Sequence, residues 1–393
     1  MMQQISLEAN EKIIFDLRSV YDSYGYSHYK MSKFEEYDLY SKNKDFLVSD
    51  GVITFTDTNG KLMALKPDVT LSIVKNTKDS ADSVQKLYYN ENVYRVSKGT
   101  HTFKEIMQVG LECIGNVDDY CIYEVLTLAI KSLMSISESC VLDISHIGLL
   151  LQAVDYAGIP ENEKADIFRC IGEKNLHELA AKCSELGVSD KNAELLKELA
   201  SMHGSPAEIL PRVNSLLENI ADEKTLSQFN GIVSSLSSFG QAVNIDFSLV
   251  DSIRYYNGFM FKGFVEGVPN SVLSGGQYDT LMKKMKRKTG AVGFAVYLDM
   301  LEQLNRTNDE YDVDTVLVYG NDVPFEEVEA QAENLRGEGS VLVLSSVPEN
   351  IRYKKLVEFL NGEVKTVENN AKCCSSEGPS GRKGIRHVRK GRL

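Results

Sequence analysis

The segment EIMQVGLECIG, residues 105–115, carries polar side chains at a spacing that could bind a small ligand. In a β-strand, alternate side chains point to opposite faces, so this segment would have an apolar face and a second face with Gln108, Gly110 and Glu112. This face could form the floor of a pocket, where Gly110 leaves room and the two polar side chains reach a ligand. A half-buried strand whose polar face contacts water has the same pattern, and periodicity alone favours that interpretation.

Three further segments carry polar or small residues beside predicted turns. Asp68 lies between a predicted strand and a predicted helix, where it could cap the helix or face a ligand's ammonium group. Tyr255 and Tyr256 are adjacent, so one points inward whichever way the strand faces, and such tyrosines are usually core residues. SGGQYD is predicted to be a glycine turn before a helix, where Gly275 and Gly276 could bring the backbone close to a ligand.

Hydrophobic periodicity predicts the elements that position these residues. A helix is predicted over residues 6–26 with Ser6 as its cap, and Asn59–Gly60 predicts a hairpin. Two strands follow over 85–97 and 104–117, and a helix is predicted near Thr70. The period is helical from about 118 to 240, strands return from 243, and AVGFAVYLDM predicts an apolar helix. This order predicts an α+β fold in which an antiparallel sheet is interrupted by a helical insertion.

The carboxy-terminal part is predicted to be separate from this domain of residues 1–310. Strands over 315–320, 340–346 and 363–369 alternate with helices over 324–339 and 350–362, which predicts a small α/β domain at 313–369. Residues 370–393 are rich in Gly, Ser and basic residues, so a disordered basic tail is expected.

Composition excludes several classes of protein. The net charge of -13 argues against nucleic acid as a partner, although the basic tail is a hint of it. No apolar run approaches the ~20 residues that span a bilayer, and the amino terminus lacks a secretory pattern. The seven cysteines form no C-x-x-C pair, so reduced thiols, a cytoplasmic location and no metal or other cofactor are expected.

Together and in order, five segments resemble the histidyl-tRNA synthetase family of class II aminoacyl-tRNA synthetases over roughly residues 5–310. The segments are LKPDVT, VYRVSKGTHTFKEIMQVGLECIG, YYNGFMF, SGGQYD and AVGFAVYLDML. The resemblance implies the class II antiparallel sheet core. The small carboxy-terminal unit is similar to a shortened anticodon-binding domain.

The chain departs from that family where the nucleotide would bind. Arg95 of the second class motif remains, but its glutamate is Ser97 and its loop arginine is Thr102. The arginine that ends the third motif is Met300, and the arginine before the paired tyrosines is Asp251. Adenylate formation depends on fixed cations facing the phosphates, so the resemblance implies that this chain makes no aminoacyl-adenylate.

The amino-acid side of the pocket keeps the family's residues. By resemblance, Asp68 and Gln108 hold the ligand's ammonium group, and Glu112 with Tyr255 or Tyr256 serves an imidazole ring. The resemblance adds further pocket residues, which are Arg95, Gly275 and Gly276. Loss of the arginine at position 251 removes the expected partner of the ligand's carboxylate.

Such a core resembles the regulatory subunits of short-form ATP phosphoribosyltransferase, the first enzyme of histidine biosynthesis. This resemblance implies a chain without activity of its own that associates as a dimer, assembles with the catalytic subunit in a hetero-octamer, and takes part in feedback inhibition by histidine. Two alternatives stay open, a divergent active histidyl-tRNA synthetase and a synthetase-like RNA-binding regulator of translation.

Overall fold

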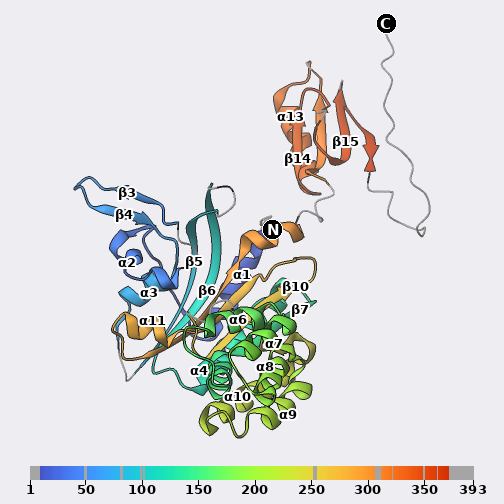
Figure 1. The fold of residues 1–393 in the computed structure, drawn as a ribbon. Coiled ribbons are helices and arrows are strands. Elements are labelled where there is room, and N and C mark those ends of the chain that lie inside the picture. Colours follow the sequence, from blue (N-terminus) through green and yellow to red (C-terminus); the bar gives the residue numbers. More distant parts are fainter. Residues whose placement is uncertain are drawn as a thin grey trace. The chain divides into compact units, whose positions relative to one another are not determined.

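The computed structural model describes residues 9–47, 51–79, 83–97, 100, 102–250, 255–305, 311–320, 322–347, 350–360 and 362–370. The chain divides into two compact units, Met1–Asn305 and Arg306–Leu393 (Figure 1). Ser6, Asp251 and the predicted tail from residue 371 onward lie outside the described residues. No helix in the described ranges combines the length and apolarity needed to cross a membrane.

A nine-stranded sheet forms the centre of the first unit. In spatial order its strands are β1 (Ser27–His28), β5 (Val84–Val96), β6 (Phe103–Gly115), β12 (Gly290–Tyr297), β11 (Leu273–Gln277), β10 (Phe259–Val265), β7 (Cys140–His146), β9 (Val243–Asp246) and β8 (His203–Gly204). Neighbours pair antiparallel except β1 with β5 and β7 with β9. The predicted antiparallel core and the long strands β5 and β6 are therefore confirmed.

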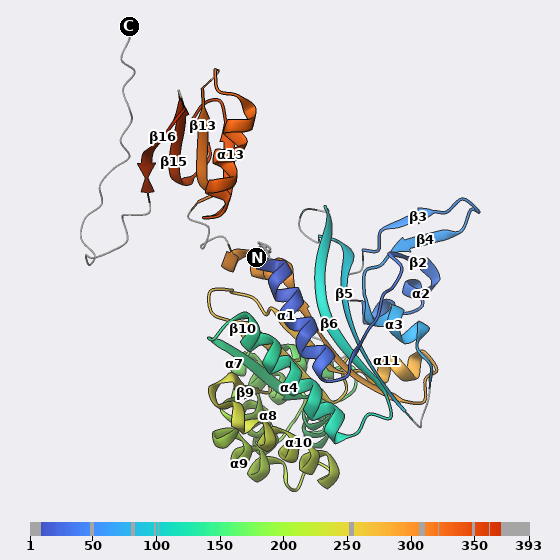
Figure 2. The same ribbon diagram turned by 180° about the vertical axis from the view of Figure 1, so that it is seen from behind.

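Two helices, α1 (Ala9–Ser23) and α4 (Asp119–Ile136), cover one face of this sheet (Figure 2). The carboxylate of Asp118 accepts the N–H of Cys121 at 2.9 Å and caps α4. The apolar face predicted for β6 lies under these helices, because Val109 and Leu111 are fully buried in the same core. The polar face of β6 is left for the opposite side of the sheet.

Most of the segment between α4 and β9 is helical, as predicted. Its helices are α5 (Ile147–Tyr156), α6 (Lys164–Gly172), α7 (Leu176–Glu185), α8 (Asp190–Ser201), α9 (Pro206–Leu217), α10 (Glu223–Leu236) and the short 3₁₀ helix η2 (Ser237–Ala242). The helical period predicted from about 118 to 240 is interrupted by β7, an inner strand of the sheet, and by the two-residue strand β8. Residues 140–146 are too few to show a period of their own between two long helical patterns.

A small three-stranded sheet precedes the long strands. Its order is β2 (Phe34–Glu36), β4 (Leu62–Leu65) and β3 (Thr54–Thr56), accompanied by α2 (Tyr37–Ser41), η1 (Lys44–Phe46) and α3 (Thr70–Asn76). The predicted hairpin is confirmed, because β3 and β4 pair antiparallel and Gly60 adopts φ +81° in the turn. The helix predicted near Thr70 is α3.

Two glycine-containing segments are strands where other structure was predicted. The apolar stretch 290–297 is β12, and only then does helix α12 (Leu298–Asn305) begin, carrying Asp299 and Met300. Gly275 and Gly276 lie within β11 instead of in a turn, and α11 (Asp279–Lys284) follows. A short apolar run that is buried on both faces has no polar alternation, so its period does not separate strand from helix.

The second unit contains β13 (Val313–Tyr319), α13 (Phe325–Arg336), β14 (Val341–Leu344), β15 (Tyr353–Leu360) and β16 (Glu363–Asn369). Its sheet has the order β14-β13-β15-β16. The helix predicted over 350–362 is wrong, since β15 pairs parallel with β13 and antiparallel with β16. Val357 and Phe359, two residues apart, are both buried in the core that includes residues of α13, which is the spacing of a strand.

Candidate functional site

The register of the central sheet gathers polar and small residues on the face away from α1 and α4. Across the β6–β12 pair, Gln108 lies opposite Tyr297 and Glu112 lies opposite Gly293. Both Gln108 and Glu112 are buried and line a pocket of about 890 Å³. The polar strand face therefore forms a pocket floor, and the alternative of a water-facing strand is excluded for these residues.

Glu112 is held by side chains from two other segments of the chain. The Thr70 hydroxyl donates to Oε1 at 2.7 Å, and the Tyr278 hydroxyl donates to Oε2 at 2.5 Å. Burial raises the pKa of the Glu112 carboxyl to about 8, although both hydrogen bonds act to lower it. This carboxyl lies at the pocket wall, where it can form a hydrogen bond to a ligand.

Asp68 accepts a backbone N–H at the start of α3, and its side chain also reaches the pocket. Its carboxylate accepts the N–H of Leu71 at 2.9 Å, which satisfies the first turn of α3, and the side chain also lines the pocket. Burial raises the pKa of Asp68, while the nearby Arg95 guanidinium acts to lower it. Arg95 lines the pocket as well, and its Nε donates to the carbonyl oxygen of Pro67 at 3.1 Å.

Tyr255 and Tyr256 both line the pocket, with their ring centroids 4.8 Å apart and their planes nearly perpendicular. The two glycines predicted as pocket residues do not line it. A Cβ atom on Gly276 would stand 2.7 Å from the Tyr256 ring, and one on Gly275 would stand 2.5 Å from Phe294 Cβ. Gly276 thus provides space for the Tyr256 ring behind the pocket wall, and Gly275 allows packing against Phe294.

Gly110, predicted to leave room for a ligand, does not line the pocket and instead leaves room for a protein side chain, because a Cβ there would stand 2.5 Å from the Tyr89 hydroxyl. Several other residues line the pocket that were not predicted from the sequence. Tyr278 is the tyrosine of SGGQYD, so its place within a recognised segment was the available signal. The remaining polar lining residues include Thr70, Lys262, Ser274 and Tyr297.

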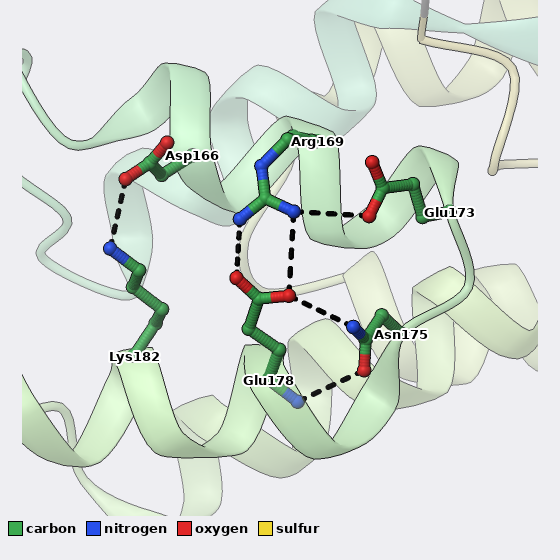
Figure 3. A network of polar contacts seen from close by, with 6 residues as sticks. All are labelled: Asp166, Arg169, Glu173, Asn175, Glu178 and Lys182. Atoms are coloured by element: carbon green, nitrogen blue, oxygen red, sulfur yellow. Dashed lines mark hydrogen bonds and ion pairs between the residues drawn. The ribbon is translucent and has the colours of Figure 1, made fainter.

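Helix α6 of the helical segment also lines the pocket, through Phe168, Arg169, Gly172 and Glu173 among others. Figure 3 shows how this helix is joined to α7, because Arg169 of α6 pairs with Glu178 of α7. Arg169 also pairs at 3.0 Å with Glu173, which directly follows α6. A second ion pair between the same helices joins Lys182 to Asp166 at 2.8 Å. The wall opposite the sheet is thus part of a two-helix structure, with Arg169 already engaged by carboxylates.

Three of the positions that depart from the synthetase pattern, Ser97, Thr102 and Met300, lie among the described residues. Met300 is partly buried against the main core, and the Ser97 N–H donates to the Thr102 carbonyl oxygen at 2.9 Å to close the β5–β6 end. None of these three side chains lines the pocket. Asp251 lies outside the described residues, and the described part of the chain holds no cluster of three or more metal-ligating side chains.

Comparison with known proteins agrees with this architecture. Residues 3–301 match the family model described as histidyl-tRNA synthetase. A crystal structure of an ATP phosphoribosyltransferase regulatory subunit/histidyl-tRNA synthetase from Bacillus halodurans superposes with a TM-score of 0.69, covering 89% of this chain and 94% of that one at 24% identity. The first unit therefore has the histidyl-tRNA synthetase fold.

The relatives define the branch within that fold. The ATP phosphoribosyltransferase regulatory subunit of Clostridium kluyveri is 30% identical over 351 residues, covering 85% of this chain and 88% of the relative. That of Acetivibrio thermocellus is 27% identical over 315 residues, covering 77% and 75% respectively. The chain belongs to the family of ATP phosphoribosyltransferase regulatory subunits.

Proposed function

We propose that this regulatory subunit assembles with a short-form ATP phosphoribosyltransferase catalytic subunit and binds histidine in the pocket on its central sheet. The observation that supports histidine best is the buried Glu112 carboxyl, held by the hydroxyls of Thr70 and Tyr278 beside Asp68 and Gln108. This donor and acceptor set suits a ligand with an ammonium group and a ring N–H.

In this proposal the two ends of histidine contact different residues. Asp68 and the Gln108 amide oxygen accept from the ammonium group, while Glu112 accepts from the imidazole ring. The hydroxyl of Tyr255 or Tyr256 provides a second partner for the ring. Arg95 takes the place of the arginine missing at position 251 as the partner of the ligand's carboxylate. It lines the same pocket and interacts electrostatically with Asp68.

Inhibition requires that histidine bind one state of the assembly more tightly than another. A solved complex of ATP phosphoribosyl transferase, HisG:HisZ, from Thermotoga maritima has a chain that superposes with a TM-score of 0.60 over 75% of this chain at 21% identity. By analogy with that complex, we propose a hetero-oligomer with the catalytic subunit. A dimer of this chain, a hetero-octamer overall and a cytoplasmic location follow from the same family resemblance.

The test combines assembly with ligand binding. The chain is mixed with the host's short-form catalytic subunit, and co-elution and activity are measured before and after mixing. Histidine is then titrated against complexes that contain wild type or Glu112→Gln. At a pH of about 8 or above, where Glu112 ionises, loss of this charged acceptor from a buried hydrogen bond should weaken histidine binding by about tenfold to a hundredfold while activation persists. An unchanged inhibition curve would place the inhibitory site elsewhere in the assembly.

A further inference from the structure

The hydroxyls of Thr70 and Tyr278, from distant parts of the chain, both donate to the carboxyl of Glu112. Thr70 begins α3, Glu112 lies on β6, and Tyr278 lies between β11 and α11. Glu112 and Tyr278 have exposed fractions of 2% and 1%. Each carboxyl oxygen has one of these hydroxyls as a partner, at 2.7 Å and 2.5 Å. Two buried groups and the half-buried Thr70 hydroxyl, joined in this way, have a fixed relative geometry.

We propose that Thr70 and Tyr278 are positioning residues that orient Glu112 to accept a single N–H from a five-membered nitrogen heteroaromatic ring and to reject the ring when that nitrogen is alkylated. This inference rests on the proposed histidine function and extends it to the source of selectivity. A site built to accept a hydrogen bond rejects analogues that lack the donor more strongly than an apolar pocket rejects an added methyl group.

The surroundings of Glu112 prevent it from turning away. A Cβ atom on Gly293 would stand 1.9 Å from Oε2, so the carboxyl lies directly on the backbone of β12. A carboxylate offers about four acceptor positions, of which the two hydroxyls occupy two. Since Glu112 lines the pocket, its remaining acceptor capacity is available to a ligand there. A methyl group on the recognised nitrogen would remove the donor and meet this fixed carboxyl.

The charged and titratable groups around Glu112 make its ionisation sensitive to the hydroxyls. Asp68 raises the pKa of Glu112, and Arg95 in turn lowers that of Asp68. Four tyrosines also interact electrostatically with Glu112: Tyr89, Tyr255, Tyr256 and Tyr278. The Tyr278 hydroxyl acts to lower the pKa of Glu112, so its removal should raise that pKa above about 8. The carboxylate then becomes harder to form, and a ring N–H is accepted less well.

The experiment measures calorimetric affinities for histidine and for its two ring N-methyl isomers, at a pH of about 8. Wild type should bind one methyl isomer at least about tenfold more weakly than histidine. Tyr278→Phe should weaken histidine by about tenfold and reduce that discrimination. Tyr297→Phe is the matched control, because Tyr297 lines the same pocket but its hydroxyl bonds to Ser274 at 2.8 Å. This control should keep the wild-type ratio of affinities.

A purely structural role for Tyr278 is distinguished by a carbon NMR titration of the Glu112 carboxyl, whose pKa should rise in Tyr278→Phe and stay unchanged in Tyr297→Phe. If Tyr278→Phe does not fold, Thr70→Val takes its place with the same expectations. Equal binding of histidine and both methyl isomers to wild type, or an unaltered ratio in Tyr278→Phe, would overturn the inference and leave the proposed function standing. No binding of histidine by the wild-type complex would overturn both.

Discussion

Gly293 on β12 lies directly opposite Glu112 on β6, and a Cβ atom at Gly293 would stand 1.9 Å from Oε2 of Glu112. The same Cβ would stand 2.4 Å from the carbonyl oxygen of Leu111. Glycine is therefore required here by a close approach within the sheet, and the position of the carboxyl depends on it.

Replacement of this glycine should disturb the pocket. In Gly293→Ala the methyl group must displace the Glu112 side chain, so the affinity for histidine should fall by more than about tenfold. Gly231→Ala is the matched control, since a Cβ at Gly231 on α10 meets no atom within 4 Å. Calorimetry measures both affinities, and circular dichroism checks that both variants keep their secondary structure. Wild-type affinity in Gly293→Ala would show that the ligand does not use Glu112.

Glu112 should make the empty protein less stable as the pH rises. Its folded pKa of about 8 lies above the value of an unfolded chain, so the folded state binds more protons between the two values and stability falls across that window. The loss should be on the order of 3–5 kcal/mol between about pH 4.5 and about pH 8. Glu112→Gln lacks this loss and should be the more stable protein at pH 8, as denaturant unfolding of the two proteins at both pH values would measure. A variant that is destabilised at pH 8, with unaltered histidine binding, would indicate a structural role for the carboxyl.

His146 predicts a loss of stability in acid. Burial lowers its pKa to about 4, and its Nδ1 accepts the N–H of Leu149 at 3.2 Å to cap α5. Because the folded pKa is depressed, the unfolded state binds more protons, so stability is complete above about pH 6.5 and falls towards pH 4 by about 3 kcal/mol. Denaturant unfolding across this range should show the loss, and His146→Asn, which keeps a capping acceptor, should show a flatter profile. Parallel profiles for the two proteins would assign the acid loss to other groups.

The chain should show no histidine-dependent exchange of pyrophosphate into ATP and should not charge tRNA. By the resemblance to the synthetases, Ser97, Thr102, Asp251 and Met300 stand where that family has residues for adenylate formation. Met300 has an uncharged thioether, which offers no cation to a phosphate, and it packs against the main core. A radioactive exchange assay with an active histidyl-tRNA synthetase as positive control measures this, and turnover above the enzyme-free blank would contradict the expectation.

Residues 371–393 should be dispensable for folding. Their composition offers little apolar area to offset an ordering entropy of ~1–2 kcal/mol per residue. A chain truncated after residue 370 should keep its melting temperature and its binding to the catalytic subunit. A large drop in either quantity would mean that this segment docks on the protein or on its partner.

The sequence predicts local features of the site better than the partners of each residue. Strand alternation places Gln108 and Glu112 on one face, and the position of Asp68 before a helix predicts its cap. The bond between Tyr278 and Glu112 depends on the pairing of β6 with β12 and of β12 with β11. Such register between distant strands has no signal in a local pattern.

Two of the errors in secondary structure have a common cause. Strands β12 and β15 are segments of eight residues, in which several buried positions fall at spacings that also suit a helix turn. Only their pairing with neighbouring strands decides between the two conformations. The error at Gly275 and Gly276 has a different cause, because adjacent glycines are typical of turns, whereas here LSGGQ pairs on both sides in the sheet.

The pairing of β6 with β12 has a consequence for synthesis on the ribosome. The first strand of the pair is made early, whereas the second emerges only after the whole helical segment from α4 to α10. Contacts between distant parts of a chain form late, and unpaired strand edges invite aggregation meanwhile. The backbone N–H and C=O groups on this edge of β6 therefore stay unpaired until β12, a strand near the end of the first unit, has been synthesised. A nascent chain released before β12 would carry Glu112 on an open sheet edge, which makes incomplete chains recognisable targets for chaperones and proteases.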